Sequence, residues 1–307
     1  MNSMVNGEGL DVRIVTSTGA DSYALGYSEA EFRRLKFQGE YLRDFTADVL
    51  RRAGIAPGMR VLDVGCGVGD VSLLVAEMVS SSGTVLGVDR SEQAVALARQ
   101  RAAAAGMDHV RFAASELEAF SPDQQFDALI GRLILAYLPD PAATLRRLSG
   151  LVRPCGTIAF QEMVLPLTCS VPDGPLFRKC CEWMMETFER AGFQIDMGSK
   201  LFATFLAAGL PVPQMTAAGH VEGGSQSPVY AYLADTLRSL LPMAERIGVA
   251  TAAEFAIETM AERLRKEAVE NNACIMPPPL VGAWTRLPAA TGQGQSGTWC
   301  SALPWSD

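Results

Sequence analysis

The chain has 307 residues, a formal net charge of -8 and 49% hydrophobic residues, which fits one large globular domain or a domain joined to a smaller one. The acidic balance argues against a nucleic-acid surface, because binding to phosphates needs a basic face. No apolar run approaches the ~18 residues that indicate a membrane span, and the N-terminus lacks the pattern of a signal peptide. We therefore expect a cytoplasmic protein that binds a small molecule, with no nucleic-acid or membrane partner, and leave homo-oligomerisation open.

Seven cysteines and two histidines are available for a disulfide framework or a metal site. The cysteines are scattered, odd in number and without C-x-x-C spacing, so we interpret them as reduced thiols. With His109 and His220 alone, a histidine-rich site is not expected either. The sequence therefore predicts no metal.

The first predicted element is a helix. Residues 1–27 are polar and show no sustained period, and we interpret them as an N-terminal arm or lid. Ser28 followed by Glu31 has the spacing of a capping box, and an apolar stripe at helical spacing comes after it. Gly54 and Pro57 then end this helix.

A strand followed directly by a glycine-rich turn comes next, in the stretch VLDVGCGVGD. The pattern predicts a buried strand at Arg60–Val64, a turn with glycines at 65, 67 and 69, and a helix at Val71–Met78. In this order of elements the backbone passes close to a ligand and a helix N-terminus faces it. Glycine suits the turn because a Cβ would block both the tight bend and the approach.

Strands and helices then alternate as far as residue 165. Further strands are expected at Thr84–Asp89, His109–Ala113, Phe126–Gly131 and Thr157–Met163, with helices at Ser91–Gly106 and Asp140–Leu151. Each strand is almost wholly apolar, which predicts a parallel sheet covered on both faces. Residues 28–165 are therefore the predicted cofactor-binding core.

Beyond Leu165 the alternation stops. Two stretches, 166–197 and 226–272, are mostly helical and are predicted to cap one end of the sheet. Trp183, Met184, Met185 and Phe188 have helical spacing, which indicates the core of this cap or an adaptable apolar pocket. Residues 198–225 and 273–287 complete the sheet core, with a helix at Ser199–Gly209 and strands at Gln214–Glu222 and Pro279–Leu287. Residues 288–307 are the expected mobile tail.

The glycine turn departs from the dinucleotide fingerprint G-x-G-x-x-G. Its third glycine comes one residue early, and Asp70 stands where that fingerprint has glycine. An acid, Asp63, precedes the turn, and Asp89 ends the next strand. This D-x-G-x-G-x-G pattern closely resembles class I S-adenosylmethionine-dependent methyltransferases of the small-molecule type, over about residues 30–165 and in element order as far as 287. The resemblance implies an α/β fold with a Rossmann-like, doubly wound seven-stranded sheet, mostly parallel with an antiparallel last strand.

The resemblance also implies S-adenosylmethionine as cofactor and S-adenosylhomocysteine as product. An acid at Asp89 would bind both ribose hydroxyls, because a carboxylate can accept two hydrogen bonds from a diol. Glu116 would accept the adenine amino group, and Asp63 would face the methionine part. Gln38 and Tyr27 are candidates for contacts from a lid-like lead-in segment. The implied cofactor residues are Asp63, Gly65, Cys66, Gly67, Gly69, Asp89, Arg90, Ser115, Glu116, Leu117, Gly131, Arg132, Leu133, Tyr27 and Gln38.

Methyl transfer requires alignment of a nucleophile, exclusion of water and, where needed, removal of a proton. A base would come from Glu162, at the end of the fifth strand, or from His220, near the end of the sixth. Both strand ends lie where open parallel sheets bind ligands. The competing interpretations are a buried hydrogen-bonded acid for Glu162 and a structural role for His220.

The predicted function is methylation of a small organic acceptor, a natural product or another metabolite. The sequence does not say whether oxygen, nitrogen or carbon accepts the methyl group. Two alternatives remain: an enzyme of this fold that uses the bound sulfonium for other chemistry such as cyclisation, and a non-catalytic protein that binds the cofactor.

Overall fold

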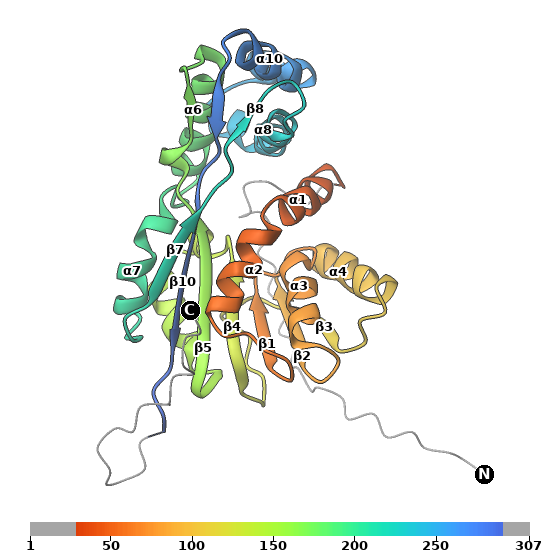
Figure 1. The fold of residues 1–307 in the computed structure, drawn as a ribbon, viewed down its shortest axis with the longest axis vertical. Coiled ribbons are helices and arrows are strands. Elements are labelled where there is room, and N and C mark those ends of the chain that lie inside the picture. Colours follow the sequence, from red (N-terminus) through yellow and green to blue (C-terminus); the bar gives the residue numbers. More distant parts are fainter. Residues whose placement is uncertain (1–28, 291–307) are drawn as a thin grey trace, which may run out of the picture.

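A seven-stranded sheet forms the centre of the computed structural model, which describes residues 29–290 (Figure 1). Its strand order is β3-β2-β1-β4-β5-β10-β7. Strands β1 to β5 pair in parallel, whereas β10 is antiparallel to both of its neighbours. The strands are β1 Arg60–Val64, β2 Thr84–Asp89, β3 Val110–Ala114, β4 Phe126–Arg132, β5 Val152–Met163, β7 Gln214–Ala218 and β10 Leu280–Arg286. The predicted Rossmann-like fold with an antiparallel last strand is therefore confirmed.

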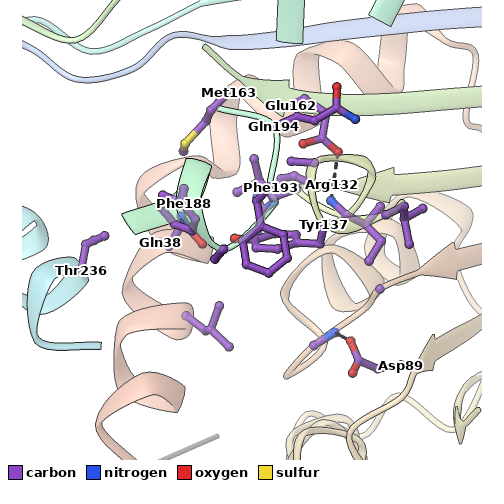
Figure 2. A pocket seen from close by; sticks show the side chains of 18 of the residues that line it. Gln38, Asp89, Arg132, Tyr137, Glu162, Met163, Phe188, Phe193, Gln194 and Thr236 are labelled. Carbon is purple, nitrogen blue, oxygen red and sulfur yellow. Dashed lines mark hydrogen bonds between the residues drawn. The ribbon is translucent and has the colours of Figure 1, made fainter. Parts of the chain in front are cut away.

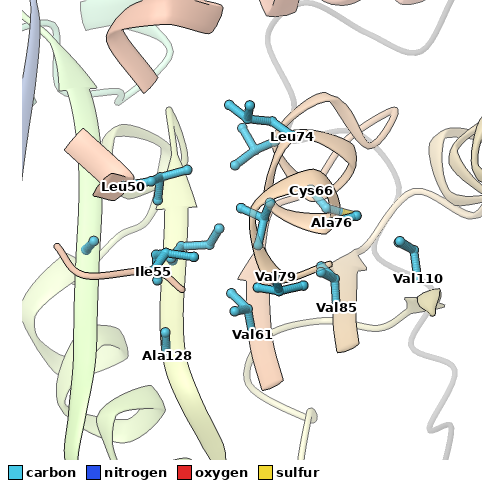
Figure 3. Close-up of a cluster of buried hydrophobic side chains, with 14 of the residues drawn as sticks. Leu50, Ile55, Val61, Cys66, Leu74, Ala76, Val79, Val85, Val110 and Ala128 are labelled. Atoms are coloured by element: carbon cyan, nitrogen blue, oxygen red, sulfur yellow. The ribbon is translucent and has the colours of Figure 1, made fainter. Parts of the chain in front are cut away.

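Helices cover both faces of this sheet, because side chains alternate along each strand. Val61 points into one buried cluster and Leu62 into the other, and neither side chain is exposed. Figure 3 shows the first cluster, to which helices contribute Leu50 and Leu74 and strands contribute Val61 and Ala128. The helices on this side are α2 Arg43–Arg52, α3 Asp70–Val79 and α4 Glu92–Ala104, and those on the other are α5 Pro141–Ser149 and α7 Met197–Ala207.

A helical cap stands over the carboxyl edge of the sheet (Figure 1). It contains α6 Pro175–Arg190, α8 Val229–Arg246, α9 Ala252–Phe255 and α10 Ile257–Glu270, which share an apolar cluster of their own. A small sheet that the sequence did not predict joins the cap segments, in the order β6-β9-β8, with β6 Cys169–Val171, β8 Glu222–Gly223 and β9 Cys274–Met276. Helix α1, Glu29–Tyr41, packs against both α8 and α3 and so connects the cap to the core.

The structure divides two of the predicted helices. The first breaks at Leu42 into α1 and α2, and the helical stretch expected at 226–272 breaks at Ala256, among other places; the φ of Ala256, 44°, is left-handed. Strand β5 begins at Val152, earlier than expected, because the pairing of β4 with β5 shifts register between Phe126 and Ala128. The strand expected at Gln214–Glu222 ends at Ala218, where β10 ceases to pair with it.

The interpretation of every cysteine as a reduced thiol is wrong at Cys155, which is disulfide-bonded. The free thiols in the described residues are those of Cys66, Cys169, Cys180, Cys181 and Cys274. Between residues 29 and 290 there is no group of acidic, histidine and cysteine side chains suited to a metal ion. In that same part of the chain, no helix has the length and apolar character needed to cross a membrane.

Candidate active site

A cavity of about 690 Å³ lies between the carboxyl edge of the sheet and the cap (Figure 2). Its walls come from the β1–α3 turn, the ends of β2, β3, β4 and β5, helix α1, the α6–α7 connection and helix α8. Small-molecule sites have volumes of about 300–1,000 Å³, so this cavity can hold a ligand of cofactor size.

The glycine turn and Asp89 form a cradle at one end of the cavity. The Gly67 N–H donates to Asp89 Oδ2 at 2.9 Å, and the Ser91 N–H donates to Oδ1 at 2.9 Å. Each carboxylate oxygen keeps a second lone pair, so Asp89 can still accept two hydrogen bonds from a diol. Gly67 has a φ of +53°, and a Cβ built on it would meet no protein atom within 4 Å. These residues fit the ribose and backbone contacts expected for S-adenosylmethionine.

Most of the predicted cofactor residues line the same cavity. Besides Gly67 and Asp89, the residues that border it are Gln38, Cys66, Arg90, Ser115, Glu116, Leu117, Arg132 and Leu133. Gly65 also lines it, with a φ of +68°. Tyr27 lies outside the described residues.

Three predicted cofactor residues are placed behind the cavity wall. Asp63 points from β1 toward α3, where its Oδ2 accepts a hydrogen bond from Ser72 Oγ at 2.6 Å. A Cβ on Gly69 would lie 3.1 Å from Ala98 and Phe112, and one on Gly131 would lie 2.5 Å from the Phe160 ring. The structure therefore gives these residues packing roles in the turn and sheet, and their contact with the cofactor stays a prediction.

His220 is also outside the cavity lining. Its Nε2 lies 2.8 Å from the Tyr41 carbonyl oxygen, and its ring stacks on the Tyr41 ring with centroids 3.9 Å apart. The side chain thus holds the end of α1 and does not face a bound substrate. We therefore do not include His220 among the candidate bases.

Glu162 does line the cavity, although its side chain is only 1% exposed. Its Oε1 accepts hydrogen bonds from the N–H groups of Ile134, at 2.9 Å, and Leu135, at 2.6 Å. Its Oε2 is buried and has no hydrogen-bond partner among the described residues. Burial raises the pKa of Glu162 to about 8, because it disfavours the charged form more than the backbone donors stabilise it.

The cap and the segment that follows β4 supply an apolar and aromatic wall to the cavity. Tyr137, Phe188 and Phe193 form edge-on ring contacts, with the Tyr137 and Phe193 centroids 5.0 Å apart. Met184 and Phe188 belong to the cap core and also face the cavity, so both interpretations of their helical spacing hold. Such a surface suits an apolar or planar acceptor.

Helix α1 closes the cavity between the core and the cap. Gln38 Nε2 donates to Tyr232 Oη on α8 at 2.8 Å. A Cβ on Gly39 would lie 2.4 Å from Asp70 Cγ, so glycine at this position lets α1 pack directly on the start of α3. Arg34 and Asp70 line the cavity beside these contacts.

Sequence reasoning missed Asp70, Tyr137 and Tyr232 as cavity residues. Asp70 carried a signal, because it replaces the third glycine of the dinucleotide fingerprint and begins helix α3. Tyr232 carried none, since its place on α8 shows only that the helix is amphipathic. Its position depends on contact with α1, which the local sequence does not specify.

Comparison with known proteins gives the class of this fold. The family profile described as "Methyltransferase domain" matches residues 55–205. A candidate methyltransferase of Bacillus halodurans has a similar structure, with a TM-score of 0.53, 15% identity, and coverage of 80% of this chain and 99% of that one. That structural likeness supports the fold alone.

Two of the most similar relatives carry the name of a quinone. The 2-phytyl-1,4-naphtoquinone methyltransferase of Synechococcus elongatus is 39% identical over 114 residues, covering 36% of this chain and 48% of the relative. The ubiquinone biosynthesis O-methyltransferase of Aromatoleum aromaticum is 38% identical over 115 residues, covering 37% and 47%.

A trans-aconitate 2-methyltransferase of Methylobacterium nodulans is 34% identical over 146 residues, covering 47% of this chain and 52% of the relative. The chain thus spans about half the length of each of these three relatives. Fold, profile and relatives together place the domain at residues 55–205 in the class I S-adenosylmethionine-dependent methyltransferase family.

Proposed function

We propose that this protein transfers a methyl group from S-adenosylmethionine to a small organic molecule enclosed between the core and the cap. The observation that carries the proposal is the single cavity that joins the Asp89–Gly67 cradle to the apolar wall of the cap. A ligand bound at the cradle and one bound under the cap would share that cavity.

The residues of the chain have distinct roles in this proposal. Asp89 would hold the ribose diol through the lone pairs that Gly67 and Ser91 leave available. Glu116 lines the cavity just beyond β3, and its carboxylate would accept the adenine amino group. The cofactor supplies an activated methyl group on a sulfonium. The protein then has to align the acceptor behind that methyl and exclude water, as the cap and α1 do here.

The relatives support a ring-bearing acceptor. Two of them are named for quinone substrates or pathways, and one for a tricarboxylic acid. The aromatic wall of Tyr137, Phe188 and Phe193 favours the quinone class, because planar rings pack well on aromatic side chains. We therefore propose a quinone-like or phenolic acceptor.

Two measurements test this function in sequence. Calorimetry with S-adenosylhomocysteine should show binding at one site, and absence of binding would contradict the cofactor assignment. Incubation with S-adenosylmethionine and a panel of hydroxylated quinones, phenols and carboxylic acids should then give methylated product and S-adenosylhomocysteine in equal amounts. Conversion of the acceptor without methylation would indicate other chemistry on the bound sulfonium, and binding without turnover would indicate a non-catalytic protein.

A further inference from the structure

One carboxylate oxygen in the cavity is buried and unexplained by the fold. Glu162 is almost fully buried, and its two oxygens have different surroundings. Oε1 accepts the N–H groups of Ile134 and Leu135 at the start of the 3-10 helix η1, Leu135–Tyr137. Oε2 accepts nothing from the described residues. A buried polar atom without a partner is costly, so its retention calls for a ligand or a function.

We propose that Glu162 Oε2 is the proton acceptor for the hydroxyl group of the substrate. This inference rests on the proposed function and adds the chemical class of the reacting group, which is an acidic hydroxyl such as that of a phenol or a hydroxyquinone.

The asymmetry of the carboxylate determines where the proton goes. Oε1 is fixed by two backbone donors, and a protonated Oε1 would lose them. A proton on Glu162 must therefore sit on Oε2, the oxygen that has no partner in the described chain. The two backbone donors also fix the direction of the carboxylate, which gives the pre-organised geometry that general bases need.

The place of Glu162 in the sheet is right for the reacting end of the cavity. Glu162 is the next-to-last residue of β5 and Asp89 is the last residue of β2, so two strands, β1 and β4, lie between theirs. At about 4.8 Å per strand, the two side chains start roughly 14 Å apart. Figure 2 shows Asp89 and Glu162 well separated, with Tyr137 and Phe193 between them in this view. A cofactor held at its ribose by Asp89 would extend toward Glu162.

The surroundings of Glu162 favour a base that works near neutral pH. Burial raises its pKa to about 8, and the backbone donors from η1 partly oppose that rise. The neighbouring strand β10 presents uncharged Val281 opposite Glu162, and the backbone carbonyl of Glu162 packs on Gly198 of α7. Of the titratable groups nearby, Tyr137 on η1 interacts electrostatically with Glu162, while Arg34 of α1 and Tyr232 of α8 line the same cavity.

The proposed step balances. The hydroxyl oxygen of the acceptor forms its bond to the methyl carbon and breaks its bond to hydrogen, and the proton passes to Glu162 Oε2. Loss of the methyl group would leave a neutral thioether, and the proton would neutralise the Glu162 carboxylate. The total charge of the reacting groups is therefore unchanged. The proton leaves to solvent when the product departs.

Glu162→Gln tests this role with little disturbance of the fold, because the amide oxygen can still accept from Ile134 and Leu135. We expect kcat to fall at least 100-fold, with the affinity for S-adenosylhomocysteine unchanged. The activity of the wild type should increase as pH rises through about 8, because Glu162 must be ionised to accept a proton. The variant should lack this increase. Glu189→Gln, at an exposed position on α6, is the matched control and should leave kcat and its pH dependence unchanged. Retained activity and an unaltered pH profile in Glu162→Gln would overturn the proposal.

Infrared spectroscopy of the cofactor-free protein gives a readout that does not depend on turnover. A neutral-carboxyl band should disappear as pH rises through about 8, and Glu162→Gln should lack that band. Absence of the band in the wild type would contradict protonation at Oε2. If the band titrates as expected but no acceptor is methylated, the proposed function fails while the proton site stands.

Discussion

The two ends of the cavity are built in different ways. At the cofactor end, backbone N–H groups of Gly67 and Ser91 hold Asp89, and these partners lie within 22 residues along the chain. At the acceptor end, side chains meet across the fold, as the Tyr137 and Phe193 rings do with their centroids 5.0 Å apart. The cofactor end therefore depends on local backbone geometry, and the acceptor end on long-range packing.

This difference separates the effects expected from mutation. Backbone donors persist through most side-chain changes, so the cofactor end should fail only when a glycine or the acid is replaced. The cap surface can be altered one side chain at a time, which should change the acceptor preference and leave cofactor binding intact. Each of the following substitutions tests that separation.

Gly67→Val should have the largest effect. Its Cβ would enter the open space where the backbone faces the cavity, and S-adenosylhomocysteine binding should fall beyond detection by calorimetry. The positive φ adds strain of about 1–3 kcal/mol. Gly106→Val is the matched control, because Gly106 also has a positive φ and open space around a Cβ but lies outside the cavity. Equal loss of binding in both variants would show that strain, and not the cavity, is responsible.

Asp89→Asn should weaken binding of S-adenosylhomocysteine by roughly 10- to 100-fold, as expected for loss of a charged hydrogen-bond acceptor worth about 1.5–3 kcal/mol. Asp127→Asn is the control. Its carboxylate also accepts a backbone N–H, from Arg60 at 2.6 Å, but it sits at the start of β4, away from the cavity. Unchanged affinity in Asp89→Asn would contradict the ribose assignment.

The separation also explains what the sequence could predict. Gly65, Gly67 and Asp89 lie close in the chain or one strand apart, so local pattern and resemblance placed them correctly on the cavity. The same reasoning expected Asp63 to face the methionine part, whereas strand alternation turns its side chain toward α3 and Ser72. The spacing of the motif predicted the strand correctly but did not show toward which element this side chain points.

The cap was predicted as helices but not as a surface. Tyr232 reaches the cavity because α1 packs against α8, and Phe193 because the segment after α6 bonds to the β4 loop, where the Gln194 N–H donates to the Ala136 carbonyl. The β6-β9-β8 sheet likewise joins segments about 50 to 100 residues apart. Such contacts depend on the assembled fold, and no local period encodes them.

Asp63→Asn should separate a folding role from a cofactor role. Burial raises the pKa of Asp63 in the folded state to about 7. Between about pH 4 and 7, Asp63 is therefore mostly protonated in the folded state and mostly ionised in the unfolded state. Stability should therefore decline as pH rises from about 4 to 7, and the cost of the charge is complete at pH 8. At pH 8 the variant should melt about 4 °C higher than the wild type, the shift expected for about 2 kcal/mol, and this gain should shrink as pH falls toward 5.

Asp48→Asn on the surface of α2 serves as the control for the Asp63 variant and should show no such pH dependence. The affinity of Asp63→Asn for S-adenosylhomocysteine should stay within about two-fold of wild type. A pH-independent change in melting, or a large loss of affinity, would restore Asp63 to the cofactor site.

Tyr232→Phe should have the smallest effect and should fall on the acceptor alone. Gln38 uses the Tyr232 oxygen as an acceptor, which leaves the hydroxyl hydrogen for a second partner, and burial raises the pKa of Tyr232 so that the hydrogen is kept. Loss of a neutral hydrogen bond worth about 0.5–1.5 kcal/mol should raise the KM for the acceptor roughly two- to ten-fold, with S-adenosylhomocysteine affinity unchanged. Tyr230→Phe on the same helix removes a comparable bond, to the Gly224 carbonyl at 3.0 Å, outside the cavity. If both variants raise KM equally, α8 affects the acceptor only by supporting the cap. That result would contradict a direct contact between the Tyr232 hydroxyl and the acceptor.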